Sequence, residues 1–319
     1  MHEISKRDVA EHVASCLQLA ILLEINAPKP GNVNRRSNFQ NTKYEHFLAS
    51  AVAIAPSFKT ATTRGILVAE GRLRYASVSI GKIIKDAVEK SNSWQHGGNT
   101  LLGTILLLSP IAVGAGKTLR ENDGILHLAK LRTNMESVTT STTPEDAVAV
   151  YEAIDIAKPG GLNKVPNFDA TEPSSKQKIL KTRTTLFDLF VISANYDSIA
   201  SEWVNNYPLV FDYGVPFLRE EVKRRDNINE AIVHTFLKLM SENPDTLIAR
   251  KAGLTKAREI SQRARQALDQ GGLSTRNGKE ALTKLDRNLR DPKNNLNPGT
   301  TADLTTATLA LLILSGYRP

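Results

Sequence analysis

The stretch TPEDAVAVYEAIDIAKPGG, residues 143–161, carries the signals for both ends of a helix and guides the interpretation of the rest of the chain. Thr143 can cap a helix, Pro144 suits its first turn, and the acidic pair 145–146 favours the positive end of the helix dipole. The apolar positions that follow recur at helical spacing, and the Pro-Gly-Gly sequence 159–161 ends the helix.

The same helical period continues along the chain, and no segment shows the clean alternation or the Asn-Gly hairpin signal that a sheet would require. We therefore expect an all-α fold: one compact multi-helix domain over residues 1–319, with a nucleotide pocket built from interhelical loops. Further helices are predicted at 174–196, 216–241, 255–269, 275–289 and 300–315, and connectors at 27–41, 91–98, 159–173 and 291–299.

The composition of the chain limits the classes of partner that it can bind. The 319 residues include 41 Lys+Arg and 33 Asp+Glu, a net charge of +8 that favours a nucleic acid, an acidic membrane or a phosphorylated small molecule as partner. Aromatic residues are 6% of the chain, too few for the stacking platforms of a single-strand binder, which argues against nucleic acid. The single cysteine, Cys16, excludes a disulfide framework.

The longest apolar run, residues 101–116, contains Pro110 and is shorter than the ~20 residues of a membrane span. We interpret it as a buried helix. The N-terminus carries charged residues where a secretion signal would have an apolar core. We therefore expect a cytoplasmic protein without membrane association.

A first candidate motif is PKPGNVNRR, residues 28–36. Its prolines restrict φ and its glycine frees one residue, so a partly stiff loop could hold cations against phosphate oxygens. The alternative is a helix-breaking linker with solvated charges. The substrate-binding candidates here are Lys29, Gly31, Asn32, Asn34, Arg35 and Arg36.

A second candidate motif is GGNTLLGT, residues 97–104. Gly98 lets backbone approach a ligand, while Asn99 or Thr100 could cap the next helix with its free N–H groups toward an anion. Gly103 leaves room for a ligand or another helix. An ordinary cap followed by a small residue at a helix crossing explains the same pattern.

A third candidate motif is NPGTTADL, residues 297–304. Thr300 with Asp303 resembles a capping box. In the functional alternative, Asp303 holds a Mg²⁺ ion that bridges phosphates, while Thr300 and backbone N–H groups contact the phosphate oxygens.

The segment GAGKT, residues 114–118, looks like the end of a phosphate-binding P-loop. That motif needs a glycine where Ile111 stands and a preceding strand. We interpret these residues as a helix C-terminus that the glycines end.

Taken in order, the three motifs resemble the triphosphoribosyl-dephospho-CoA synthase family (CitG/MdcB-like), and residues 151–161 look like its archaeal-type branch. The resemblance spans about residues 19–312 and implies an all-helical transferase. It would join the triphosphoribosyl group of ATP to the 2′-hydroxyl of 3′-dephospho-CoA or a related acceptor and release adenine. The matching residues are Lys29, Gly31, Asn34, Arg35, Asn99, Thr100, Gly103, Pro298, Gly299 and Asp303.

Breaking an N-glycosidic bond builds positive charge on the sugar. Asp303 is our candidate for the metal ligand or for stabilising that charge, with Mg²⁺ accompanying ATP. Glu152 and Asp155, on one helix face, are candidates for the general base, and Arg250 and Lys251 could add cations.

The chain also departs from the bacterial family pattern. Asn34 stands in place of an aspartate, Leu101-Leu102 in place of His-Lys, and residues 39–43 in place of an acidic stretch. An N-glycosidic hydrolase or phosphoribosyl-type enzyme with another acceptor therefore stays open, as does a non-catalytic helical binder of nucleotides or nucleic acid. The sequence leaves the acceptor and the oligomeric state undefined.

Overall fold

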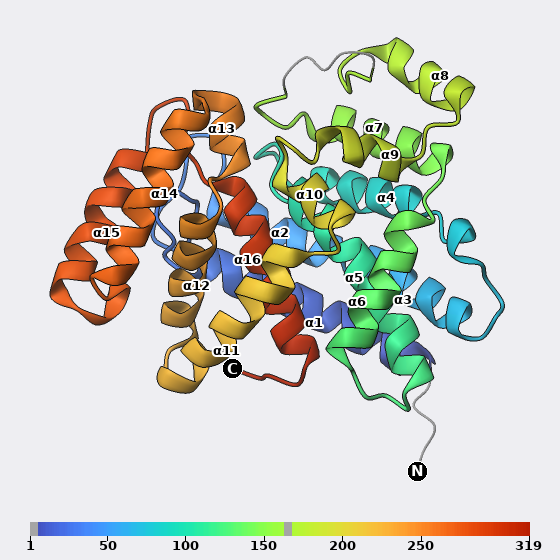
Figure 1. The fold of residues 1–319 in the computed structure, drawn as a ribbon, viewed down its shortest axis with the longest axis horizontal. Helices are drawn as coiled ribbons and strands as arrows, with labels where there is room; N and C mark the ends of the chain where they lie inside the picture. Colours follow the sequence, from blue (N-terminus) through green and yellow to red (C-terminus); the bar gives the residue numbers. More distant parts are fainter. Residues whose placement is uncertain (1–5, 163–167) are drawn as a thin grey trace.

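The computed structural model describes residues 6–162 and 168–319, and within them the chain forms helices and loops without a β-strand, as predicted. The fold is shown in Figure 1. The α-helices are α1 (Lys6–Asn26), α2 (Tyr44–Ala53), α3 (Ala55–Ala69), α4 (Ile80–Ser93), α5 (Leu102–Glu121), α6 (Leu128–Thr140), α7 (Pro144–Ala157), α8 (Pro173–Thr182), α9 (Leu186–Ser193), α10 (Ser198–Val204), α11 (Val215–Arg224), α12 (Ile228–Glu242), α13 (Thr246–Ala252), α14 (Leu254–Asp269), α15 (Arg276–Leu289) and α16 (Gly299–Leu314).

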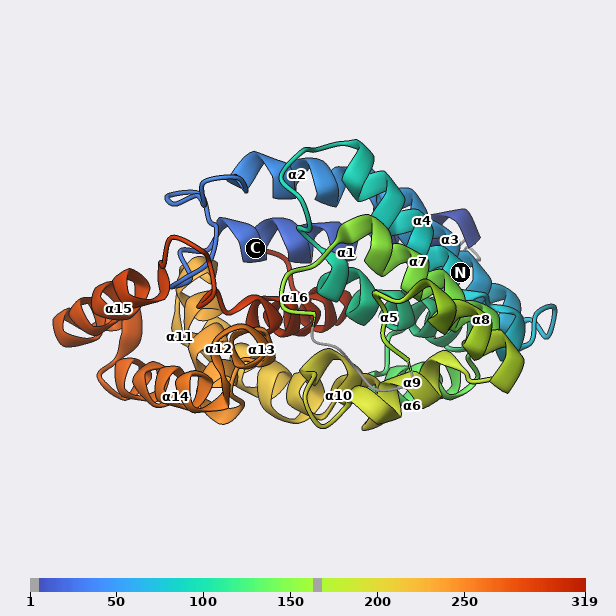
Figure 2. The same ribbon diagram turned by 90° about the horizontal axis from the view of Figure 1, so that it is seen from above.

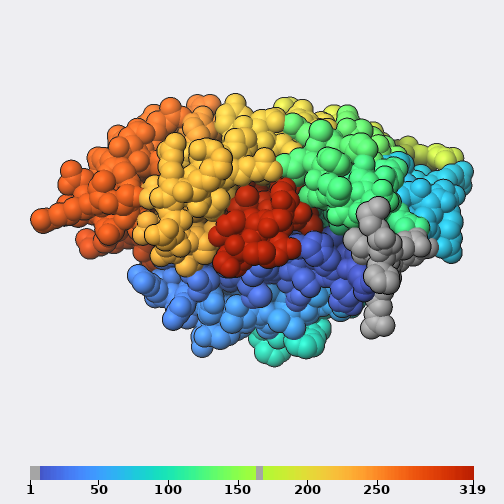
Figure 3. All heavy atoms as spheres, turned by 90° about the horizontal axis from the view of Figure 1, so that it is seen from below, coloured from blue at the N-terminus to red at the C-terminus, as the bar shows by residue number. Residues whose placement is uncertain are grey.

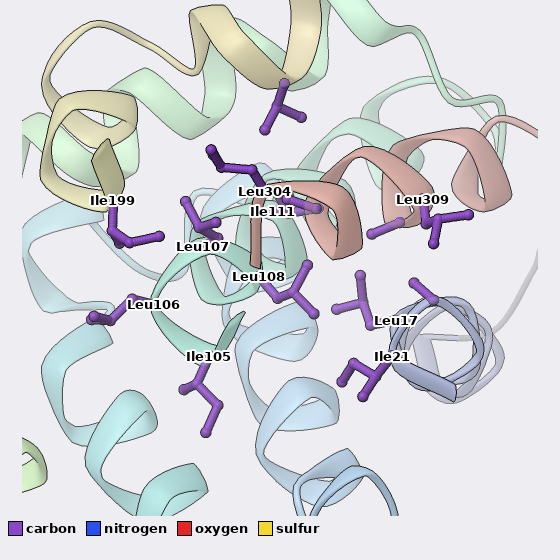
Figure 4. Packing of buried hydrophobic residues seen from close by; sticks show 14 of the residues in the cluster. Leu17, Ile21, Ile105, Leu106, Leu107, Leu108, Ile111, Ile199, Leu304 and Leu309 are labelled. Carbon is purple, nitrogen blue, oxygen red and sulfur yellow. The ribbon is translucent and has the colours of Figure 1, made fainter. Parts of the chain in front are cut away.

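Helix α5 lies at the centre of the hydrophobic core. By length and composition it could cross a membrane, but 89% of its apolar window is buried inside the protein. It is therefore a core helix, as the apolar run predicted. Figure 4 shows α5, α16 and α1 packed on one another, with Leu107, Leu108 and Ile111 on α5, Leu304 and Leu309 on α16, and Leu17 and Ile21 on α1.

The interpretation of residues 114–118 as a helix end is wrong, because α5 continues to Glu121. The glycines there serve packing instead. A Cβ on Gly116 would lie 2.2 Å from the backbone oxygen of Thr62, and one on Gly65 would lie 1.9 Å from that of Val113. Glycine at both positions lets α3 and α5 cross with their backbones in contact.

Two predicted long helices are each divided in two. The region 174–196 forms α8 and α9, because Thr185 starts a new helix by accepting from Asp188 N while the Asp188 carboxylate accepts from Thr185 N. The region 216–241 forms α11 and α12, with Asn227 capping the second helix. Part of the predicted connector 159–173, residues 163–167, lies outside the described residues.

The helices divide between two ends of the molecule. Helices α14 and α15 form one end, and α7, α8 and α9 lie toward the other (Figure 1). Seen from above, α2 and α4 lie on one side of α5 and α16, while α6, α9 and α10 lie on the opposite side (Figure 2). From below, the C-terminal residues fill the space between the N-terminal helix and the segments around α11 and α12 (Figure 3).

We expect Gly65→Ala to lower the free energy of unfolding by about 1–3 kcal/mol, because the added methyl group must push α3 away from α5. Urea denaturation followed by circular dichroism measures the change. Thr63→Ala, on the exposed face of the same helix, is the control and should stay within about 0.5 kcal/mol. Equal urea midpoints for Gly65→Ala and Thr63→Ala would contradict the close backbone contact between α3 and α5.

Candidate functional site

Residues from all three sequence motifs line one cavity of about 440 Å³. This size lies within the roughly 300–1,000 Å³ range of small-molecule sites. The N-terminal turns of α5 and α16 form part of its wall, and the segment after α1 contributes another part. The predicted site residues that it brings together are Asn32, Asn99, Thr100, Gly103, Gly299, Thr300 and Asp303.

The second and third motifs meet in direct contact between α5 and α16. The hydroxyl of Thr104 donates to Oδ1 of Asp303 over 2.6 Å. A Cβ on Gly103 would lie 2.1 Å from the other carboxyl oxygen of Asp303. Gly103 is therefore the small residue that lets the two helices approach, and it is Asp303 that fills the space.

The capping box predicted for Thr300 and Asp303 is wrong, because another residue caps α16. The Oδ2 atom of Asp245 accepts from the backbone N (2.7 Å) and the hydroxyl (2.8 Å) of Thr301. Its Oδ1 accepts from the backbone N of Leu247 and of Ile248, so this buried carboxylate caps α13 as well. Because Asp245 caps α16, the Asp303 carboxyl is not needed as a cap, and it lines the cavity instead.

The surroundings of Asp303 keep its carboxyl neutral. Burial raises its pKa to about 8, the charges of Glu24 and Asp245 add to the rise, and the hydrogen bond from Thr104 opposes it. At neutral pH the group is therefore mostly protonated and able to donate a proton, like other carboxyls that enzymes hold in weakly solvated sites.

The first motif builds the cavity but does not direct its cations into it. The ammonium of Lys29 is fully buried and pairs with Oε1 of Glu24 at 3.0 Å, while also donating to the backbone oxygens of Glu24 and Ala27. Burial lowers the pKa of Lys29 and raises that of Glu24. Glu24 lines the cavity, whereas Lys29 lies behind it.

Other residues of the first motif shape the loop. The amide of Asn34 donates to the backbone oxygen of Asn32 and accepts from the backbone N of Arg36. Gly31 has φ +74° and packs so closely on Leu289 that a Cβ would lie 2.6 Å from it. Asn32 donates to the backbone oxygen of Pro298, which joins the first motif to the third.

Several other candidates lie outside the cavity lining. Arg35 and Arg36 are exposed and border a separate surface depression with Lys279. Gly98 is exposed with φ +77°. Glu152 pairs with Lys85 at 2.9 Å, and Asp155 pairs with Lys176. Surface ion pairs account for both acids, so the geometry gives no support to either as a general base.

Sequence reasoning missed several cavity residues. Lys158, at the C-terminal end of α7, was missed, and it lines the cavity together with Arg250 and Lys251 of α13, which were predicted as additional cations. Glu24 of the cavity lining was also missed, as was Asp245, which lies outside the lining and caps two helices. Glu24 could have been found, because it continues the apolar stripe of the first helix, where a carboxylate needs a special reason.

We expect Lys29→Met to lower the free energy of unfolding by about 3–5 kcal/mol, because it leaves the Glu24 carboxylate buried without its partner. The Glu24→Gln/Lys29→Met double variant removes both charges and should recover much of that loss. Denaturant unfolding of both variants measures the difference. A phosphate-binding Lys29 would give the opposite pattern, with unchanged stability in the single variant.

Comparison with known proteins identifies the family of the chain. The sequence profile of the CitG family, described as ATP:dephospho-CoA triphosphoribosyl transferase, matches residues 10–318.

Two curated relatives carry the name "Probable 2-(5''-triphosphoribosyl)-3'-dephosphocoenzyme-A synthase". One, from Vibrio cholerae (strain M66-2), is 23% identical over 91% of this chain and 83% of its own. The other, from Pseudomonas fluorescens (strain Pf0-1), is 25% identical over 95% of this chain and 91% of its own.

A solved structure from Archaeoglobus fulgidus, also described as a triphosphoribosyl-dephospho-CoA synthase, shares the fold. It has a TM-score of 0.60 and 24% identity, and the match covers 85% of this chain and all of that one. The family profile spans nearly the whole chain and includes all three motifs that meet at the cavity. The chain therefore belongs to the CitG family of ATP:dephospho-CoA triphosphoribosyl transferases.

Proposed function

We propose that the cavity binds ATP and 3′-dephospho-CoA, or a closely related acceptor, and transfers the triphosphoribosyl group to the acceptor's 2′-hydroxyl with release of adenine. The observation that carries the proposal is the meeting of three distant family motifs around one neutral carboxyl, that of Asp303. Family membership supplies the reaction class, and the geometry supplies a place for it.

We assign the proton transfers to Asp303. The bond between the ribose C1 and adenine breaks with its electron pair going to adenine, which needs a proton to leave. A protonated carboxyl can supply it, and the carboxylate then formed stabilises the positively charged sugar. The acceptor hydroxyl attacks C1 and returns its proton to Asp303, so one residue serves as acid and then as base.

The described residues do not fit a dedicated magnesium site. Asp303 is mostly protonated at neutral pH, Glu24 is already paired with Lys29, and no group of three or more His, Cys, Asp or Glu side chains is arranged to hold a metal in the described ranges. We therefore propose that Mg²⁺ enters with ATP, as part of the substrate.

The apolar part of the cavity suits the acceptor. Its lining includes Phe47, Phe168 and Phe190, and Leu101 and Leu102 stand where the bacterial pattern has a basic pair. Apolar side chains can hold the uncharged pantetheine arm of dephospho-CoA by burial. We propose that Leu101 and Leu102 determine any difference in acceptor preference from the bacterial pattern.

We expect Asp303→Asn to abolish adenine release from Mg-ATP, because an amide cannot donate or recover the proton. Chromatography of adenine, with and without dephospho-CoA, measures the reaction. Asp212→Asn, at an exposed ion pair with Arg132, is the matched control and should keep full activity.

The remaining outcomes of the adenine-release assay also distinguish the possible functions. Full turnover by Asp303→Asn would remove this residue from the chemistry. In the unmodified protein, release that requires the acceptor supports the transferase, release without it indicates a hydrolase, and ATP binding without release indicates a binder.

We also expect Asp303→Asn to stabilise the protein increasingly as the pH rises. The folded-state pKa of about 8 lies above the ordinary aspartate pKa of 3.8, so between these pH values the folded state holds a proton that the unfolded state has lost. Between these values, raising the pH therefore costs the unmodified protein stability. Thermal melts from about pH 5 to about pH 9 should show the gap between variant and unmodified protein widening up to about pH 8. A constant gap would contradict the raised pKa.

A further inference from the structure

We infer that Lys158, Arg250 and Lys251 form the subsite for the triphosphate of the nucleotide. The inference rests on the proposed function and names the part of the cavity that receives the most highly charged part of the substrate. These three are the lysines and arginines among the cavity-lining residues that the structure describes. The arginines that the first motif offered lie on the outside surface.

The three cations come from two segments that pack on each other. Lys158 ends α7 in a left-handed conformation, and the glycines after it lie against α13. A Cβ on Gly160 would lie 3.1 Å from Cε of Lys251, and one on Gly161 would lie 3.1 Å from its Cγ. The Pro-Gly-Gly sequence that ends α7 therefore also lets the chain lie over the Lys251 side chain.

These cations are only partly neutralised by the protein. Arg250 donates through Nη1 to Asp197 over 2.7 Å, but its buried Nε has no hydrogen-bond partner among the residues that the structure describes. Lys251 donates to two uncharged oxygens, the backbone oxygen of Asn294 and Oδ1 of Asn297, both at 3.1 Å. Lys158 has no ion-pair partner among the described residues. Among the described residues, these three cations have one direct ion pair, between Arg250 and Asp197.

A bound polyanion would complete these interactions. Burial lowers the pKa of Lys251, and the charges of Asp245 and Asp291 offset this only in part, so phosphate oxygens in contact with the ammonium would favour its charged form. Arginine presents a planar set of donors suited to phosphate, and the buried Nε of Arg250 is a donor that the described part of the chain leaves without an acceptor.

The position of α13 fits a nucleotide whose ribose reaches Asp303. Thr246, at the start of α13, lies 3.3 Å from Thr300 of α16, measured between the two hydroxyl oxygens. Arg250 follows Thr246 by one helical turn and so lies on the same face of α13. The triphosphate would lie along α13, with the sugar at the turn of α16 that carries Asp303.

Isothermal titration with inorganic triphosphate tests the subsite without requiring turnover. Arg250→Met and Lys251→Met should each weaken its binding about tenfold or more, since each removes a charge-assisted contact. Lys256→Met is the matched control, because Lys256 lies nearby on α14 and pairs with Glu259 outside the cavity lining. It should bind within about twofold of the unmodified protein. Arg250→Lys should recover part of the lost affinity by restoring the charge.

The outcomes separate this inference from the proposed function. Unchanged binding in both methionine variants, or no binding by the unmodified protein, would overturn the subsite even if adenine is released. A loss confined to Arg250→Met and Lys251→Met supports the subsite even if no transfer occurs. If Lys256→Met loses as much triphosphate affinity as the other two variants, the loss reflects only the lower net charge of the protein. That result would overturn the subsite. Adenosine binding, unchanged in all variants, shows that the cavity is intact.

Discussion

The contact between Asp303 and the first turn of α5 is the constraint on which the site depends. Two largely buried helices meet there, and one of them brings a carboxyl group into the meeting point. Gly103 provides the space and Thr104 provides one hydrogen bond. This environment excludes enough water to keep the carboxyl neutral. The same contact between α5 and α16 therefore packs the core and sets the protonation state of Asp303.

Much of the charge near the cavity stabilises the architecture that surrounds it. Asp245 satisfies the free backbone N–H groups of two helices at once, and the pair of Lys29 with Glu24 fixes the loop after α1. A residue in a recognisable motif can therefore act one layer behind the site. Lys29 has the sequence position expected of a phosphate ligand, yet its ammonium is fully buried on the protein's own oxygens.

The sequence predicted best what local signals control. Helix α7 has a cap, a proline and acids at one end and Pro-Gly-Gly at the other, and the structure begins and ends it as expected. The predicted start of the last helix was correct to one residue, but its cap was not, because Asp245 reaches it from 56 positions earlier in the chain. Helices α3, α4, α6, α10 and α13 were not predicted, although α10 and α13 each begin at a local cap, Asp197 and Asp245.

The same distinction applies to the site. Each of the three motifs was visible because its residues are adjacent in the sequence. The burial of Lys29 and the exposure of Arg35 are properties of the folded chain, and single-sequence patterns do not encode them. The cations that do line the cavity, Lys158 and Arg250 among them, come from segments with no phosphate-binding signature of their own.

A crystal structure of the protein with Mg-ATP bound tests the central claim most directly, because it locates the nucleotide without relying on any variant. Our account predicts the ribose beside Asp303 and the triphosphate along α13, with Lys29 still paired to Glu24. A nucleotide bound on the outer surface at Arg35 and Arg36, with the cavity left to solvent, would contradict it.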